Sequence, residues 1–98
     1  MIGFGEVLKA VECPYISTGG HLTFLYYEVS KLKEPIVLEL GVHEGFGSTV
    51  ALLAGVNKAT GHLYSVDVAE CQGARKLYEN EPNWTFTQSE SVAFAKQW

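Results

Sequence analysis

Hydrophobic residues recur at intervals of three and four along the first third of the chain. The first such run covers residues 4–12 and predicts a short helix with one apolar face, which Cys13 and Pro14 end. The second run covers residues 21–33 and predicts a longer helix, after a loop-like stretch at 17–20. We therefore expect residues 1–33 to form an N-terminal helical segment.

From residue 34 the pattern changes to short apolar runs that alternate with helical ones. Residues 36–42 are nearly all apolar and too few for a helix flanked in this way, so they predict a parallel strand buried on both faces. Two more strands are expected at 62–67 and 84–87, and helices at 50–56, 72–80 and 92–96. Strands joined by helical crossovers predict a parallel sheet.

This alternation predicts the fold class. We expect residues 34–98 to form an α/β domain, a truncated Rossmann-like three-layer fold with a three-stranded parallel sheet in the order 3-2-1 and flanking helices. Together with the helical segment it should make a single compact unit.

A glycine-rich turn follows the first expected strand. It contains Gly41, Gly45 and Gly47, and Ser48 lies where the next helix begins. At the carboxyl edge of a parallel sheet, glycines can adopt positive φ and let a ligand approach the backbone, while the helix terminus adds N–H groups and partial positive charge. The turn is a candidate binding loop, and a purely structural tight turn is the alternative.

Asp67 ends the second expected strand. If that strand lies next to the first one in a parallel sheet, the carboxylate comes to lie beside the glycine turn. There it could accept hydrogen bonds from both hydroxyls of a ribose. The alternative is that Asp67 caps the helix that follows.

The spacing of the glycines separates two classes of ligand. A dinucleotide-binding fingerprint reads G-x-G-x-x-G, whereas this chain reads G-x-x-x-G-x-G with Glu39 two residues before the first glycine. The segment resembles motif I of the class I S-adenosylmethionine-dependent methyltransferases, acid-x-Gly-x-x-x-Gly. The resemblance covers residues 34–94 and is greatest to the small-molecule methyltransferases related to cephalosporin hydroxylases and sugar O-methyltransferases. A nicotinamide-binding protein remains a less favoured alternative.

The resemblance implies S-adenosylmethionine as cofactor and assigns roles to the residues of the turn. Glu39 and Gly41 would border the methionine end of the cofactor. Gly45 and Gly47 would leave room for it, and Asp67 would hold the ribose. Glu39 also lies in a buried run, so its carboxylate must be hydrogen-bonded either to the ligand or to neighbouring backbone.

Three further residues are candidates for contact with the cofactor. Glu90, after the third strand, falls where the family often has an Asp that reaches the adenine amino group, although this chain has Ser-Glu-Ser where the family often shows Gly-Asp-Ser. His43 projects from the glycine turn, and Ser48 begins the helix after it.

Composition and charge narrow the range of partners. A net charge of -4 and a pI near 5.2 provide no basic footprint for nucleic acid. No run approaches the roughly 18 apolar residues of a membrane span, and the N-terminus lacks the pattern of a secretion signal. Cys13 and Cys71 are far apart, which favours free thiols and a cytoplasmic location, and the histidines lack the spacing of metal ligands.

The sequence stops before a fourth strand. In the family that it resembles, the residues that bind the acceptor come mainly from later segments, so no catalytic residue can be named. The resemblance implies methyl transfer to a small-molecule acceptor, and a degenerate, non-catalytic binding or assembly module is the alternative. The strand at 36–40 should become a sheet edge, covered by the first two helices, by a second copy in a two-fold homodimer, or by a C-terminal segment that this sequence lacks.

Overall fold

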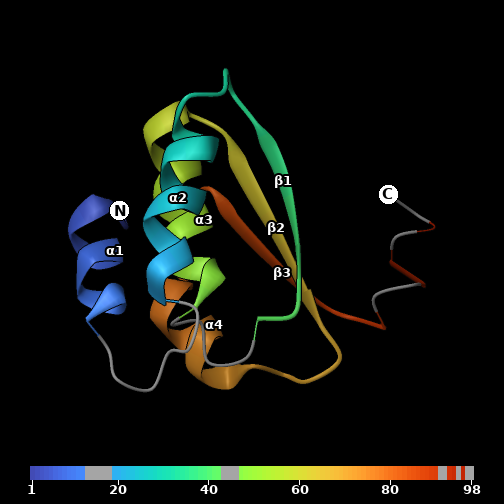
Figure 1. Cartoon of the computed structure of the whole chain (residues 1–98). Helices are drawn as coiled ribbons and strands as arrows, with labels where there is room; N and C mark the ends of the chain where they lie inside the picture. Colours follow the sequence, from blue (N-terminus) through green and yellow to red (C-terminus); the bar gives the residue numbers. More distant parts are fainter. Residues whose placement is uncertain (13–18, 43–46, 91–92, 95, 97–98) are drawn as a thin grey trace.

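The structure is a computed structural model that describes residues 1–12, 19–42, 47–90, 93–94 and 96. Its elements in chain order are α1 (Phe4–Val11), α2 (Gly19–Ser30), β1 (Ile36–Leu40), α3 (Ser48–Ala59), β2 (His62–Asp67), α4 (Gln72–Tyr78) and β3 (Trp84–Gln88), as Figure 1 shows. Every element expected before residue 90 is present, with ends that differ by a few residues. The helix expected at 92–96 lies largely outside the described residues.

The three strands form one parallel sheet. β1 pairs with β2 and β2 pairs with β3, both in parallel, so the order is β1-β2-β3. This is the expected order 3-2-1 read from the opposite edge, and the prediction is confirmed. Because the strands are parallel, all three carboxyl ends lie at one edge of the sheet, where Leu40 aligns with Val66 and Asp67 aligns with Gln88.

The described helices lie on one face of the sheet (Figure 1). The crossover from β1 to β2 and the crossover from β2 to β3 run in the same direction across the sheet. Because the two crossovers have the same handedness, α3 and α4 lie on the same side of the sheet. The strand side chains on that side join the helices in one core cluster: Val29, Val37, Leu53, Val56, Leu63, Ala74, Tyr78, Trp84 and Phe86. The described part of the chain therefore does not form the three layers that we expected, because no described helix covers the other face.

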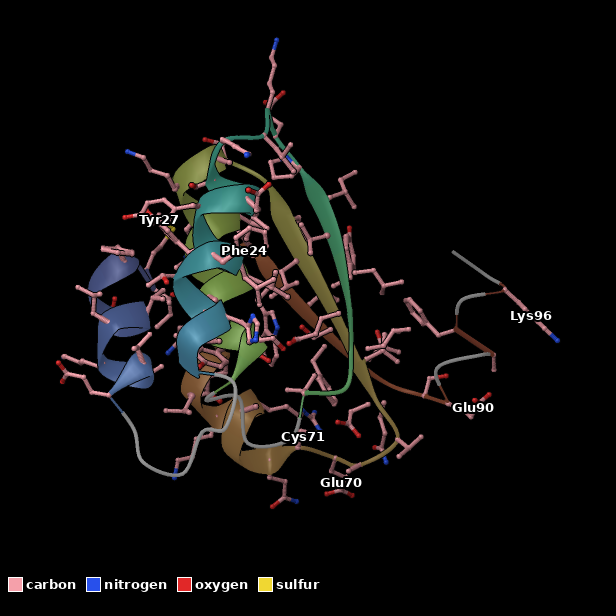
Figure 2. All side chains as sticks on the ribbon, in the orientation of Figure 1. Phe24, Tyr27, Glu70, Cys71, Glu90 and Lys96 are labelled. Atoms are coloured by element: carbon pink, nitrogen blue, oxygen red, sulfur yellow. The ribbon has the colours of Figure 1, made fainter. Side chains whose placement is uncertain are left out.

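The N-terminal helices pack against α3 through a second core cluster. Its buried members are Val7, Ala10, Leu22, Tyr26, Val50, Ala51 and Ala54. Phe4 stacks against Tyr26 with their ring centroids 4.7 Å apart. Phe24 and Tyr27 lie on the exposed side of α2 (Figure 2). The helical segment and the sheet are thus joined through α2 and α3, each of which contributes to both clusters.

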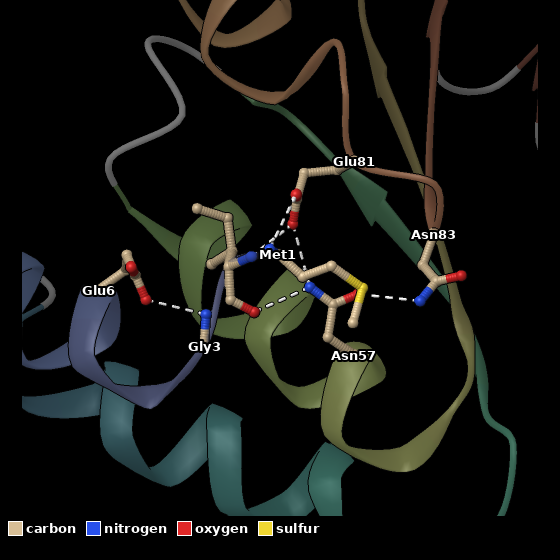
Figure 3. A network of polar contacts seen from close by, with 7 residues as sticks. Met1, Gly3, Glu6, Asn57, Glu81 and Asn83 are labelled. Carbon is tan, nitrogen blue, oxygen red and sulfur yellow. Dashed lines mark hydrogen bonds and ion pairs between the residues drawn. The ribbon is translucent and has the colours of Figure 1, made fainter.

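A network of hydrogen bonds connects the start of the chain to the turn before β3 (Figure 3). Glu81 accepts a 2.6 Å hydrogen bond from the backbone N–H of Ile2, and Asn57 on α3 donates to the carbonyl of Ile2 at 2.8 Å. Asn57 also donates to Glu81 and accepts from Asn83. Three separate parts of the chain therefore meet around Asn57.

The outer edge of β1 is not covered by the first two helices. Ile36 keeps 70% of its surface exposed and Leu40 keeps 54%, because α1 and α2 pack on α3 and not along β1. Of the three ways in which the sequence predicted that the β1 edge is covered, the first, by α1 and α2, is therefore not observed.

We predict that Gly55→Ala destabilises the protein even though alanine is the better helix former. A Cβ at Gly55 would lie 2.8 Å from Val29 Cβ, so α2 and α3 would have to separate. The free energy of unfolding should fall by about 1 to 3 kcal/mol, as in other overpacked cores. Urea denaturation followed by circular dichroism measures it. Gly5→Ala on exposed α1 is the control, since no described atom lies within 4 Å of its Cβ position, and an equal loss there would contradict the packing argument.

Candidate functional site

The chain bends at Gly41, immediately after β1. Its N–H donates to the carbonyl of Val66 at 2.7 Å and completes the pairing with β2. The φ of Gly41 is +95°, a conformation that glycine adopts far more readily than other residues. No described atom lies within 4 Å of the position of a Cβ at Gly41 or at Gly47, where α3 begins. The backbone is therefore accessible at both ends of the bend.

Asp67 lies against this bend, as the sequence predicted. Its Oδ2 accepts a 2.8 Å hydrogen bond from the backbone N–H of Val42, and its Oδ1 accepts one of 3.0 Å from Ala69. The side chain is partly exposed. The alternative in which Asp67 caps the following helix is wrong, because α4 begins at Gln72 with Cys71 as its N-cap residue. Asp67 instead fixes the position of the backbone after Gly41.

Glu39 is a buried carboxylate that accepts hydrogen bonds from three hydroxyl groups. Ser48 donates to Oε2 at 2.6 Å, and Ser65 donates to Oε1 at 2.8 Å. The hydroxyl of Thr49 lies 2.8 and 2.9 Å from the two oxygens. These partners belong to α3 and β2, so the side chain joins β1 to both. We expected a ligand or neighbouring backbone as its partner, and the structure gives side-chain hydroxyls.

The network continues to the third strand. Trp84 Nε1 donates to the hydroxyl of Ser65 at 2.9 Å, and Ser65 donates in turn to Glu39. Burial raises the pKa of Glu39, an effect that the three hydroxyls oppose and that the nearby charge of Asp67 reinforces. Burial, with smaller contributions from Glu39 and Glu81, raises the pKa of Tyr78 to about 12. The pKa of Glu39 thus depends on the charge of Asp67.

Of the remaining predicted site residues, the structure describes Gly47, Ser48 and Glu90. Ser48 directs its hydroxyl to Glu39, and Gly47 is the N-cap residue of α3. Glu90 is exposed after β3, and its carboxylate accepts a 3.0 Å hydrogen bond from the N–H of Ala93. His43 and Gly45 lie outside the described residues. The structure therefore brings Glu39, Ser48 and Asp67 to the ends of β1 and β2, while Glu90 lies at the end of β3.

Three residues of the network were missed from the sequence, namely Thr49, Ser65 and Trp84. Ser65 aligns with Glu39 in the β1 to β2 register, so both side chains lie on the same face of the sheet. The alternation of side chains along each strand could have suggested this pairing, but only once the register was known.

A comparison of the sequence with protein-family models and with curated proteins finds no match. The site is therefore interpreted from its own geometry. Among the described residues there is no group of three or more His, Cys, Asp or Glu side chains that could hold a metal ion. Within the same part of the chain, none of the helices has the length and apolar character needed to cross a membrane.

We predict that Glu39→Gln weakens the dependence of stability on pH. Folding raises the pKa of Glu39, so above its ordinary value of 4.5 the folded state retains a proton that the unfolded state has lost. The free energy of unfolding of the wild type should therefore decrease as the pH rises through this range. Glutamine does not titrate, so the decrease should be smaller.

Urea denaturation at several pH values between about 4 and 8 measures this difference. Glu79→Gln, which removes one exposed carboxylate from the end of α4, is the control for net charge. If Glu39→Gln and the wild type show the same slope, the titration of Glu39 does not contribute.

Proposed function

We propose that this chain binds S-adenosylmethionine at the carboxyl ends of β1 and β2, as the cofactor-binding part of a class I methyltransferase-like protein. The supporting observation is the 2.8 Å hydrogen bond between Asp67 Oδ2 and the N–H of Val42, which holds a carboxylate beside a glycine bend with positive φ. In parallel α/β sheets a ribose diol binds to an acid in this position, while the bend lets the ligand approach the backbone.

The charge of the site favours a cationic ligand. The charge of Asp67 raises the pKa of Glu39, so a positive charge bound at the partly exposed Asp67 is favourable for both carboxylates. S-adenosylmethionine has a sulfonium and an ammonium group, whereas NAD has an anionic pyrophosphate. Both carboxylates therefore disfavour NAD, in agreement with the glycine spacing.

Glu39 and Asp67 have different roles in this proposal. The carboxylate of Glu39 already accepts hydrogen bonds from Ser48, Thr49 and Ser65 and is buried, so it positions the start of α3 relative to β1 and β2. Asp67 is partly exposed and would contact the cofactor itself. When bound, S-adenosylmethionine supplies an electrophilic methyl group, and the chain contributes by fixing its orientation towards a small nucleophilic acceptor.

We predict that the protein binds S-adenosylmethionine and S-adenosylhomocysteine, and that Asp67→Asn weakens both. Asparagine keeps one oxygen to accept from Val42 but loses the charge and one acceptor. Loss of a hydrogen bond to a charged group corresponds to about 1.5 to 3 kcal/mol, a roughly 10- to 100-fold rise in Kd. Isothermal titration calorimetry measures the affinities.

Glu70→Gln is the matched control, because it removes a carboxylate at the same edge of the sheet that is exposed and hydrogen-bonded to Gln72. It should leave both affinities nearly unchanged. The cationic cofactor should bind more tightly than its neutral product if the two carboxylates act through charge. NAD binding tighter than that of either ligand would overturn the proposal, and so would equal losses in the two variants.

A further inference from the structure

The outer edge of β1, with which no described strand pairs, has a defined row of backbone groups. On the paired side, the carbonyl of Pro35 accepts from His62 at 2.9 Å and the N–H of Gly41 donates to Val66 at 2.7 Å. Backbone groups alternate along a strand, so those of Val37 and Glu39 also face β2. The N–H and C=O groups of Ile36, Leu38 and Leu40 consequently point away from the sheet, along its outer edge.

This edge lacks the features that usually prevent strand pairing. Protected edges have outward charges, prolines or bulges. The only charged residue of β1 is Glu39, whose side chain is 5% exposed and directed to the helices. On the opposite face Ile36 and Leu40 are 70% and 54% exposed. Another strand of apolar character could therefore pair with this edge.

We infer that two copies of the chain pair antiparallel through β1, about a two-fold axis that passes by Leu38. In this register Leu38 lies opposite Leu38 of the second copy, and Ile36 lies opposite Leu40. All three outward residues then form hydrogen-bonded pairs, each of which exchanges two backbone bonds. The sheet becomes continuous across both copies, with six strands in all.

The charge of Glu39 favours this register over the one in which the axis is shifted by one residue. An axis at Glu39 would place two like-charged carboxylates directly opposite each other, which is destabilising. An axis at Leu38 places Glu39 opposite Val37 of the second copy, so no like charges meet along the seam. With the axis at Leu38, every outward N–H and C=O group of β1 is also hydrogen-bonded to the second copy. With a shifted axis, some of these groups remain unpaired.

Contact between the α2 helices would enlarge the interface. A standard interface buries about 800 Å² on each partner, and a five-residue strand is only about 17 Å long. The axis is perpendicular to the sheet, so the helices of both copies lie on the same face. Figure 1 shows α2 at the β1 side of the helical layer, and Figure 2 shows Phe24 on α2 at the height of the middle of β1. Phe24 is 59% exposed and would meet its counterpart above the seam.

The first test measures the oligomeric state. Light scattering coupled to size-exclusion chromatography of the full chain, over a hundredfold range of concentration, should show a dimer that dissociates on dilution. Ile36→Lys replaces an apolar residue opposite Leu40 of the second copy with a charged one and should raise the dissociation constant at least tenfold. Leu77→Lys is the control, because Leu77 is also an exposed apolar residue, 52% exposed, but lies on α4. Circular dichroism verifies that both variants fold.

The second test measures the register. In a chain with both cysteines changed to serine, Leu38→Cys should be joined to itself by dibromobimane, a short thiol cross-linker. Ile36→Cys should not react with itself, because the two copies of residue 36 would lie about 14 Å apart, four residues along the strand. A mixture of Ile36→Cys and Leu40→Cys should react.

A monomer at every concentration overturns the inference, as does a dimer that persists unchanged in Ile36→Lys. Cross-linking of Ile36→Cys to itself contradicts the register. The inference does not depend on the cofactor site, since none of these measurements requires S-adenosylmethionine. Failure of the dimer and failure of cofactor binding are therefore separate results.

Discussion

The hydrogen bonds that Glu39 accepts inside the fold determine the geometry of the site. A buried carboxylate is unfavourable unless it is fully hydrogen-bonded, and here the donors come from the first turn of α3 and from β2. The carboxylate therefore fixes where α3 starts relative to the sheet. Since the glycine bend connects β1 to α3, its two ends are fixed by the same interaction, and Asp67 then holds the backbone between them at Val42.

The sheet has two faces in very different environments. On one face, strand side chains pack with α2, α3 and α4 in a single cluster. On the other, Ile36 and Leu40 remain largely exposed among the described residues. This asymmetry follows from the strand order, because two successive crossovers in one direction place their helices together. A fold of this kind buries its sheet on both sides only when another element or another molecule covers the second face.

The order of the elements could be predicted from the sequence because it depends on local periodicity. The expected strand at 62–67 has the bounds of β2, and the position of Asp67 beside the bend followed from parallel pairing alone. The partners of Glu39 could not be predicted, since Ser65 faces it only in one register of β1 against β2. The placement of the described helices on a single face was also not predictable, because repeating strand and helix patterns do not specify how many faces the helices cover.

The polar network around Asn57 also affects how the molecule opens. Because Asn57 contacts both the backbone of Ile2 and the carboxylate of Glu81, α1 cannot separate from α3 without breaking bonds that also position the turn before β3. The first and last described elements, which are far apart in the chain, should therefore exchange their amide hydrogens as one cooperative unit. In a sheet this small, fraying at the N-terminus would spread to the third strand.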